Sequence, residues 1–181
     1  MAMTAKGLGL GLVLLLGAAQ QGPELCPGLI AEYYELGSAV EDFPVLAPER
    51  KPSLRRVEPQ VNVESTEESF AGTGLTEAFY VRWTGLLRVP AAGKYTFYSE
   101  SDDGSRVFIG ETKVIDNNGL HPMEEKSGEI ELKAGDHPIR IEMFENTGQA
   151  GCRISWEGPG LAKEIIPARA FYHAKDKDLD R

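Results

Sequence analysis

The sequence contains little cysteine, which limits how its fold can be stabilised. Its 181 residues include two cysteines, Cys26 and Cys152, so it is not a small domain held by many disulfides. In an oxidising compartment, one bridge between these two is favoured. It would tie the start of the chain to a segment near its end. Two separate thiols are the alternative that the sequence leaves open.

Apolar runs long enough to span a membrane are also missing. Residues 1–21 carry one lysine, Lys6, followed by small and apolar residues from Gly7 to Ala19. This order is typical of a secretory signal peptide, and the run is short and glycine-rich for a membrane span. No small residues directly precede Cys26, which disfavours a lipid anchor. The sequence therefore predicts a soluble, extracytoplasmic protein, either secreted or periplasmic.

Positive charge is scarce, and so are the signatures of enzymes. The chain has 19 Lys and Arg against 28 Asp and Glu, a formal charge of -9, which disfavours nucleic acid and anionic membranes as partners. It lacks a Gly-x-Ser-x-Gly elbow, a His-Glu-x-x-His helix, a P-loop and a dinucleotide-binding glycine motif. A carboxylate pair for glycoside hydrolysis would be visible only in three dimensions. A small sandwich offers less of a cleft than a glycosidase needs, so we predict no catalysis.

Short alternating segments predict an all-β protein. In Ala78–Val89, the side chains of Phe79, Val81 and Trp83 share one face, as in a half-buried strand. Strands of this kind with glycine turns between them indicate an antiparallel β-sandwich, here one domain over residues 27–172 with a charged, frayed tail at 173–181. The predicted strands are Leu29–Glu35, Ala78–Val89, Lys94–Glu100, Arg106–Ile109, Lys113–Asp116, Gly128–Lys133, His137–Glu145 and Gly151–Trp156, and Phe43–Val61 is predicted to be an extended, proline-rich connection.

The most distinctive motif is Asp102-Asp103-Gly104, between two predicted strands. Successive side chains of a strand point to opposite faces, so the two carboxylates converge only if the backbone departs from a regular strand. A hard cation such as Ca²⁺ would favour convergence, because it binds carboxylate oxygens and cancels their repulsion. The alternative is a polar β-turn, since Asp and Gly are common turn formers.

The ordered set of motifs from about Gly28 to Tyr172 resembles the protective-antigen (PA14) domain family. That family is a β-sandwich found in exported glycosidases, adhesins, toxins and fungal flocculins, and its best understood members bind sugars through calcium. The resemblance therefore implies this fold, a calcium cofactor and a glycan or polysaccharide partner. The motifs are Gly28–Tyr34, Phe79–Val89, Gly93–Phe97, Ser101–Ile109, Val114–Asn117, Lys133–Ile141 and Ser155-Trp156.

The resemblance also assigns roles to individual residues. In the family, an Asp-Asp pair joined by a cis peptide holds the calcium, together with an asparagine and backbone carbonyls of a later loop. Here the pair corresponds to Asp102 and Asp103, and the loop to Phe144–Gly151. The implied metal ligands are Asp102, Asp103, Asn146 and carbonyls of about Gly148 and Ala150, and the implied ligand contacts are Asp102, Asp103, Asn117, His121 and Gln149.

Other polar clusters are predicted to be structural. Asn118-Gly119 is a strong turn signal, and Glu124-Glu125-Lys126 is interpreted as a solvated charge cluster. His137 and His173 have no metal-ligating partner at a useful spacing. Trp83 and Trp156 alternate with apolar neighbours, which indicates core positions.

Two functional hypotheses follow from the sequence. The first is a secreted, calcium-dependent, lectin-like module that adheres to carbohydrate. The second is a structural or protein-interaction domain without metal, in which Asp102-Asp103-Gly104 only forms a corner. A convergent cis pair beside Asn146 would favour the first hypothesis. A trans pair with splayed carboxylates would favour the second.

Overall fold

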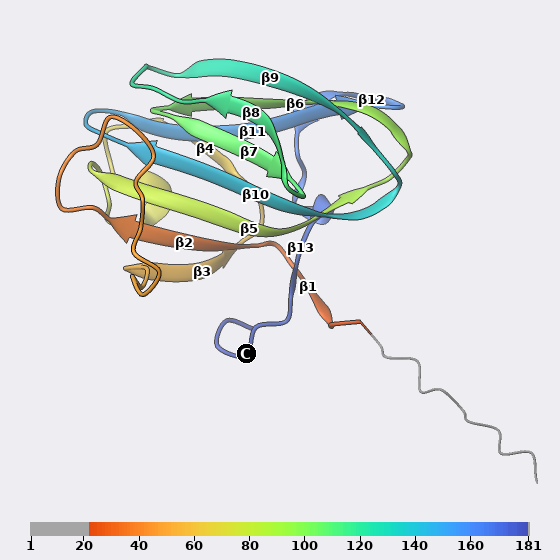
Figure 1. Cartoon of the computed structure of the whole chain (residues 1–181), viewed down its shortest axis with the longest axis horizontal. Helices are drawn as coiled ribbons and strands as arrows, with labels where there is room; N and C mark the ends of the chain where they lie inside the picture. The colour runs from red at the N-terminus through yellow and green to blue at the C-terminus, as the bar shows by residue number, and fades with distance from the viewer. Residues whose placement is uncertain (1–21, 181) are drawn as a thin grey trace, which may run out of the picture.

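Alternating apolar and polar side chains form two antiparallel β-sheets that pack face to face (Figure 1). The computed structural model describes residues 22–180. Within this range, one sheet has eight strands, namely β1 (Leu25–Pro27), β2 (Leu29–Glu35), β3 (Leu54–Glu58), β5 (Phe79–Val89), β7 (Ser105–Ile109), β8 (Thr112–Asn117), β10 (Gly135–Glu145) and β13 (Phe171–Ala174). The other has five, namely β4 (Asn62–Thr66), β6 (Gly93–Asp102), β9 (Glu124–Leu132), β11 (Ala150–Gly158) and β12 (Leu161–Ile165). Two 3-10 turns, Phe70–Gly72 and Ala168–Ala170, lie in the connections. The predicted all-β sandwich is confirmed.

The hydrophobic core lies between the two sheets. Phe79, Val81 and Trp83 of β5 are fully buried, as their alternation predicts. From the other sheet, Tyr95 of β6 and Trp156 of β11 fill the space opposite, with ring centroids 5.8 Å apart. Both tryptophans are therefore core residues, as the sequence indicates, and neither is an exposed platform for a sugar.

Two connections cross from one sheet to the other beside each other. The first leads from β6 in the five-stranded sheet to β7 in the eight-stranded sheet, and the second leads from β10 back to β11. In the registers, Asp102 lies opposite Gly151 of β11, and Ser105 lies opposite Met143 of β10. The two pairings bring both crossings to the same edge of the sandwich.

Several strands at sheet edges are missing from the sequence prediction. β3 lies inside the segment 43–61, which is predicted to be an extended connection, and it pairs with β2 alone. β4 pairs with β11 alone. Edge strands commonly carry polar and charged residues, so they lack the apolar alternation by which a half-buried strand is recognised.

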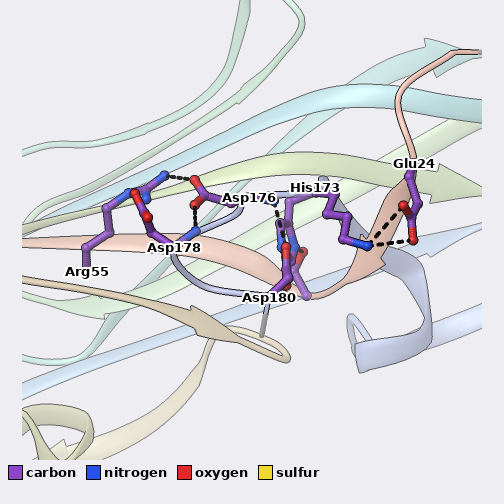
Figure 2. Close-up of polar contacts among 8 residues, drawn as sticks. Glu24, Arg55, His173, Asp176, Asp178 and Asp180 are labelled. Carbon is purple, nitrogen blue, oxygen red and sulfur yellow. Dashed lines mark hydrogen bonds and ion pairs between the residues drawn. The ribbon is translucent and has the colours of Figure 1, made fainter.

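The charged C-terminal segment is held against the domain, so the prediction of a frayed tail is wrong. β13 pairs with β1 and β5. Arg55 of β3 donates to the Asp176 carboxylate at 2.6 Å, and Lys175 forms an ion pair with Glu24, just before β1 (Figure 2). These contacts join the first and last described segments of the chain.

The predicted disulfide between Cys26 and Cys152 is also wrong, since both cysteines are free thiols in the described part of the chain. Cys26 lies on β1, opposite His173 of β13. Cys152 lies in the other sheet, opposite Ser101 of β6. Burial raises the pKa of the Cys152 thiol to about 12, so this side chain is neutral and packs as part of the core.

None of the helical segments between residues 22 and 180 has the length and apolar character required to cross a bilayer. The predicted signal peptide, residues 1–21, lies outside the described residues.

Candidate metal centre

Three acidic side chains meet where the two crossings lie side by side. Asp102 and Asp103 come from the first crossing, and Glu145 is the last residue of β10, just before the second. One carboxylate oxygen from each lies within 4.8 Å of the others. The residues are 9%, 6% and 0% exposed, so three carboxylates share a nearly dry space. The arrangement provides the kind of oxygen-rich site that hard cations prefer.

The Asp102–Asp103 peptide bond is cis. In a regular strand, successive side chains point to opposite faces, whereas here the Asp102 and Asp103 side chains converge. The cis pair is the geometry that the family resemblance implies.

Backbone hydrogen bonds fix the Asp103 carboxylate. Its Oδ1 accepts from the His121 N–H at 3.0 Å, and its Oδ2 accepts from the Asn146 N–H, also at 3.0 Å. The Asp103 N–H in turn donates to Glu145 Oε2 at 3.1 Å. Asp103 therefore joins three segments of chain, and its orientation is set before any ligand arrives.

The electrostatics of the cluster disfavour three full negative charges. Burial, followed by the charges of Asp103 and Asp102, raises the pKa of Glu145 to about 8. Burial and the neighbouring Asp103 raise the pKa of Asp102 to about 6. A divalent cation would reverse both effects, because it stabilises the ionised forms of all three groups.

Unpaired oxygens provide a test of whether a cation fits. Asn146 Oδ1 and Glu145 Oε1 are buried and have no hydrogen-bond partner in the part of the chain that the structure describes. Buried polar atoms nearly always have a partner. These two oxygens, next to the Asp102 and Asp103 carboxylates, are hydrogen-bond acceptors without donors. A metal ion satisfies such atoms. The donor set therefore fits a calcium ion.

Sequence reasoning missed Glu145, although a signal was present. Ile139, Ile141 and Met143 alternate on the buried face of β10, and Glu145 continues the same face. An acid on the apolar face of a strand is costly unless it is paired or bound to a metal. The acid Glu145 follows three apolar residues at every second position, and this break in the pattern indicated the third carboxylate.

The remaining predicted site residues have different environments. His121 approaches the centre through its backbone N–H, and its ring nitrogens lie against the Asn117 and Pro122 carbonyls. Asn117 is fully buried and donates to Ser101 Oγ at 3.2 Å and to a backbone carbonyl. Its amide nitrogen braces β8, while its Oδ1 is a third buried oxygen without a partner among the described residues, so the ligand contact from Asn117 stays a prediction.

The second crossing contains the other predicted positions. The exposed Gln149 side chain accepts a hydrogen bond from Ser65 Oγ at 3.0 Å and donates to Glu67 at 3.3 Å. It therefore faces β4 and the loop after it. Gly148, with a φ of 108°, and the buried Ala150 flank Gln149 in the crossing. Their carbonyls stay predicted ligands.

Gly104 has a steric role, which a substitution tests. A Cβ at this position would lie 2.4 Å from Phe144 Cε1, so Gly104→Ala forces the ring or the corner to move. We expect a loss of about 1–3 kcal/mol in the free energy of unfolding, measured by urea denaturation. Gly22→Ala, where a Cβ meets no atom within 4 Å, is the control. Equal stability of the two variants would contradict this packing.

Comparison with known proteins assigns the family. The PA14 domain model matches residues 25–170. The chain belongs to the PA14 domain family. The match confirms the resemblance carried by the ordered sequence motifs. It also covers both crossings, so the three carboxylates lie within the PA14 domain.

Relatives of this PA14 domain are known from sequence and structure. It is 32% identical over 97 residues to anti-sigma-I factor RsgI3 of Acetivibrio thermocellus. The aligned region covers 53% of this chain and only 15% of that protein. An anti-sigma factor domain-containing protein from Clostridium clariflavum has a TM-score of 0.68 and 27% identity over 84% of this chain and 49% of that one. A PA14 sugar-binding domain from an RTX adhesin has a TM-score of 0.69 and 22% identity over 81% of this chain and 98% of that one. The adhesin likeness concerns the fold alone.

Proposed function

We propose that this PA14 domain is a calcium-dependent carbohydrate-binding module. The observation that carries the proposal is the buried group of three carboxylates next to Asn146, in which Glu145 Oε1 and Asn146 Oδ1 have no partner among residues 22–180. A structural corner needs neither the convergent pair nor the orphan acceptors. A calcium ion accounts for both, because it is coordinated by six to eight oxygens of this kind.

Each residue has a role in this proposal. Asp102, Asp103 and the Asn146 side chain hold the ion, with carbonyls from about Gly148 and Ala150, and Glu145 contributes its unpartnered Oε1 from the buried side. When bound, calcium supplies coordination positions for the hydroxyl oxygens of a sugar. Asp102 is the most exposed of the three acids, so its carboxylate is the one that accepts hydrogen bonds from those hydroxyls.

The wider setting supports a binding role. The RTX adhesin domain that shares this fold is described as sugar-binding, and the acidic charge of this chain suits a cation site better than a polyanionic partner. We propose a non-catalytic module that acts outside the cytoplasm. A protein-interaction role without metal is the alternative.

Retention on carbohydrate tests the proposal. The purified protein is passed over a panel of immobilised glycans and polysaccharides in calcium buffer and in EDTA. We expect retention on at least one of them in calcium, loss of retention in EDTA, and loss in Asp103→Asn, which keeps one acceptor oxygen for the backbone. If calcium gives no saturable heat in calorimetry and no glycan retains the protein, the interaction-domain hypothesis replaces this one.

A further inference from the structure

A second group of metal-ligating side chains lies where the two ends of the domain meet, apart from the three carboxylates. Cys26 of β1, His173 of β13 and Asp180 of the tail each place a ligand atom within 4.8 Å of the other two. Figure 2 shows His173 and Asp180 side by side beneath the paired ends of the chain. Cys26 lies at the opposite end of the sequence from His173, so the absence of a partner at a useful sequence spacing gave no sign of the cluster.

The fold positions each member of this terminal cluster. Cys26 lies directly opposite His173 in the β1–β13 register, so their side chains share one face of the sheet. Asp180 is carried by a turn in which the Asp176 N–H donates to its Oδ2 at 2.7 Å and its own N–H donates to the Asp176 carbonyl at 2.8 Å. Since Asp176 is paired with Arg55, this turn is itself fixed to β3.

Hydrogen bonding determines which nitrogen of His173 is free. The Nδ1 atom lies 3.0 Å from the Gly28 carbonyl oxygen. A carbonyl only accepts, so Nδ1 carries the hydrogen. In the neutral ring, Nε2 then presents a lone pair, and it faces the Asp180 oxygens at 3.0 and 3.1 Å. Two acceptors at this distance need a positive charge between them, either a proton or a metal ion.

The environment of the ring favours the metal. His173 is only 2% exposed, and a ring N–H held by a backbone carbonyl is the usual outer contact of a metal-ligating histidine. A catalytic cysteine needs a base nitrogen directed at its sulfur, but here both nitrogens already have other partners. The Cys26 thiol therefore completes a ligand set and does not form a nucleophile–base pair.

We propose that Cys26 Sγ, His173 Nε2 and the Asp180 carboxylate bind a thiophilic divalent metal ion, with Zn²⁺ the best fit. Sulfur, nitrogen and oxygen ligands of this kind are those that zinc takes, and three of them leave its fourth position for water. Binding releases the thiol proton to solvent and leaves a thiolate on the metal. The ion joins β1 to β13 and the tail, so it stabilises the closed ends of the domain.

A zinc ion between the Cys26 sulfur and the Asp180 carboxylate would make two neighbouring acidic groups ligands of one cation.

Metal titration of the purified, EDTA-stripped protein tests the proposal. We expect one saturable Zn²⁺ site by competition with a chromogenic chelator, at least tenfold weaker in Cys26→Ser and in Asp180→Asn, together with a rise in Tm on zinc binding. Co²⁺ is the spectroscopic probe. It should give a thiolate-to-cobalt charge-transfer band in the wild type and none in Cys26→Ser.

The controls separate this terminal site from the carboxylate centre. Cys152→Ala, which removes the other thiol, should keep the cobalt band, and saturating Ca²⁺ should leave the zinc affinity unchanged. The proposal is overturned if the wild type takes up no zinc, if both ligand variants bind it with wild-type affinity, or if cobalt binds without the thiolate band. In those cases, His173 and Asp180 form only an imidazolium–carboxylate ion pair.

Discussion

Replacement of Asp102 by asparagine is expected to weaken calcium binding by about a hundredfold or more and to leave the metal-free protein folded. The affinity of a calcium site depends strongly on the number of charged ligands, and Asp102 is one of three carboxylates gathered within 4.8 Å. In the described part of the chain its side chain accepts no hydrogen bond, unlike that of Asp103. The substitution therefore removes charge without leaving a buried donor unpaired, and it relieves repulsion in the metal-free state.

Calorimetry with calcium, together with thermal denaturation in EDTA, measures both effects. Glu111→Gln, which removes one negative charge from an exposed position, is the matched control and should bind calcium as the wild type does.

Asp103→Ala is a less clear test of the calcium site. It leaves the His121 and Asn146 N–H groups without an acceptor and is expected to cost about 1–3 kcal/mol of stability by itself. Wild-type calcium affinity in Asp102→Asn would remove this residue from the centre.

Replacement of Glu58 by alanine is expected to cause the largest loss of stability, about 3–5 kcal/mol. Glu58 ends β3 and is 7% exposed. Its carboxylate accepts from Tyr33 OH and from Trp83 Nε1, each at 2.6 Å, and from Arg56. Alanine leaves a buried hydroxyl and an indole N–H without their acceptor and removes the ion pair with Arg56, whose guanidinium keeps the Ala71 carbonyl.

Urea denaturation monitored by tryptophan fluorescence measures this loss. Glu58→Gln keeps one acceptor oxygen and is expected to lie between alanine and the wild type. Glu64→Ala, at an exposed position on the next strand, should stay within about 0.5 kcal/mol of the wild type. If Glu58→Ala were as stable as Glu64→Ala, the network would contribute nothing to the fold.

The strands with strong alternation were predictable from local sequence. Leu29–Glu35 has the predicted bounds, and β5 and β10 differ from theirs by one or two residues. Their core-facing positions follow the side-chain period, which the sequence displays directly, although Tyr80 and Phe144 on the opposite face are also buried. Strands β4 and β12 lack that period, because their residues pair at sheet edges where neither face needs to be apolar throughout.

The candidate site was partly predictable. Asp102-Asp103-Gly104 stands out locally, because two acids and a glycine interrupt a strand pattern. The third carboxylate, that of Glu145, lies 42 residues after Asp103 in the sequence. The pairings of β10 with β7 and of β11 with β6 bring the two residues together. Asn117 is a further case, because its burial and its hydrogen bonds to Ser101 and the Glu124 carbonyl depend on the packing of β8 and not on local sequence.

The terminal cluster depended on tertiary structure to an even greater extent. Cys26 and His173 become neighbours through the β1–β13 pairing, and the same pairing keeps Cys26 in a different sheet from Cys152. Sequence spacing carries no information about such contacts, because two residues at opposite ends of a chain meet only through the topology between them.

By itself, the sequence determined the fold class, the inward-facing aromatic residues, the family and the acidic corner. Each of these is encoded in local period or in an ordered set of motifs. Tertiary structure alone decided which acids share a dry space, which polar residues are buried, and which of the two cysteines lies beside a histidine. The physical reason is that periodicity is a property of neighbours along the chain. Burial, charge clustering and metal geometry depend on which sheets and crossings are brought together in space.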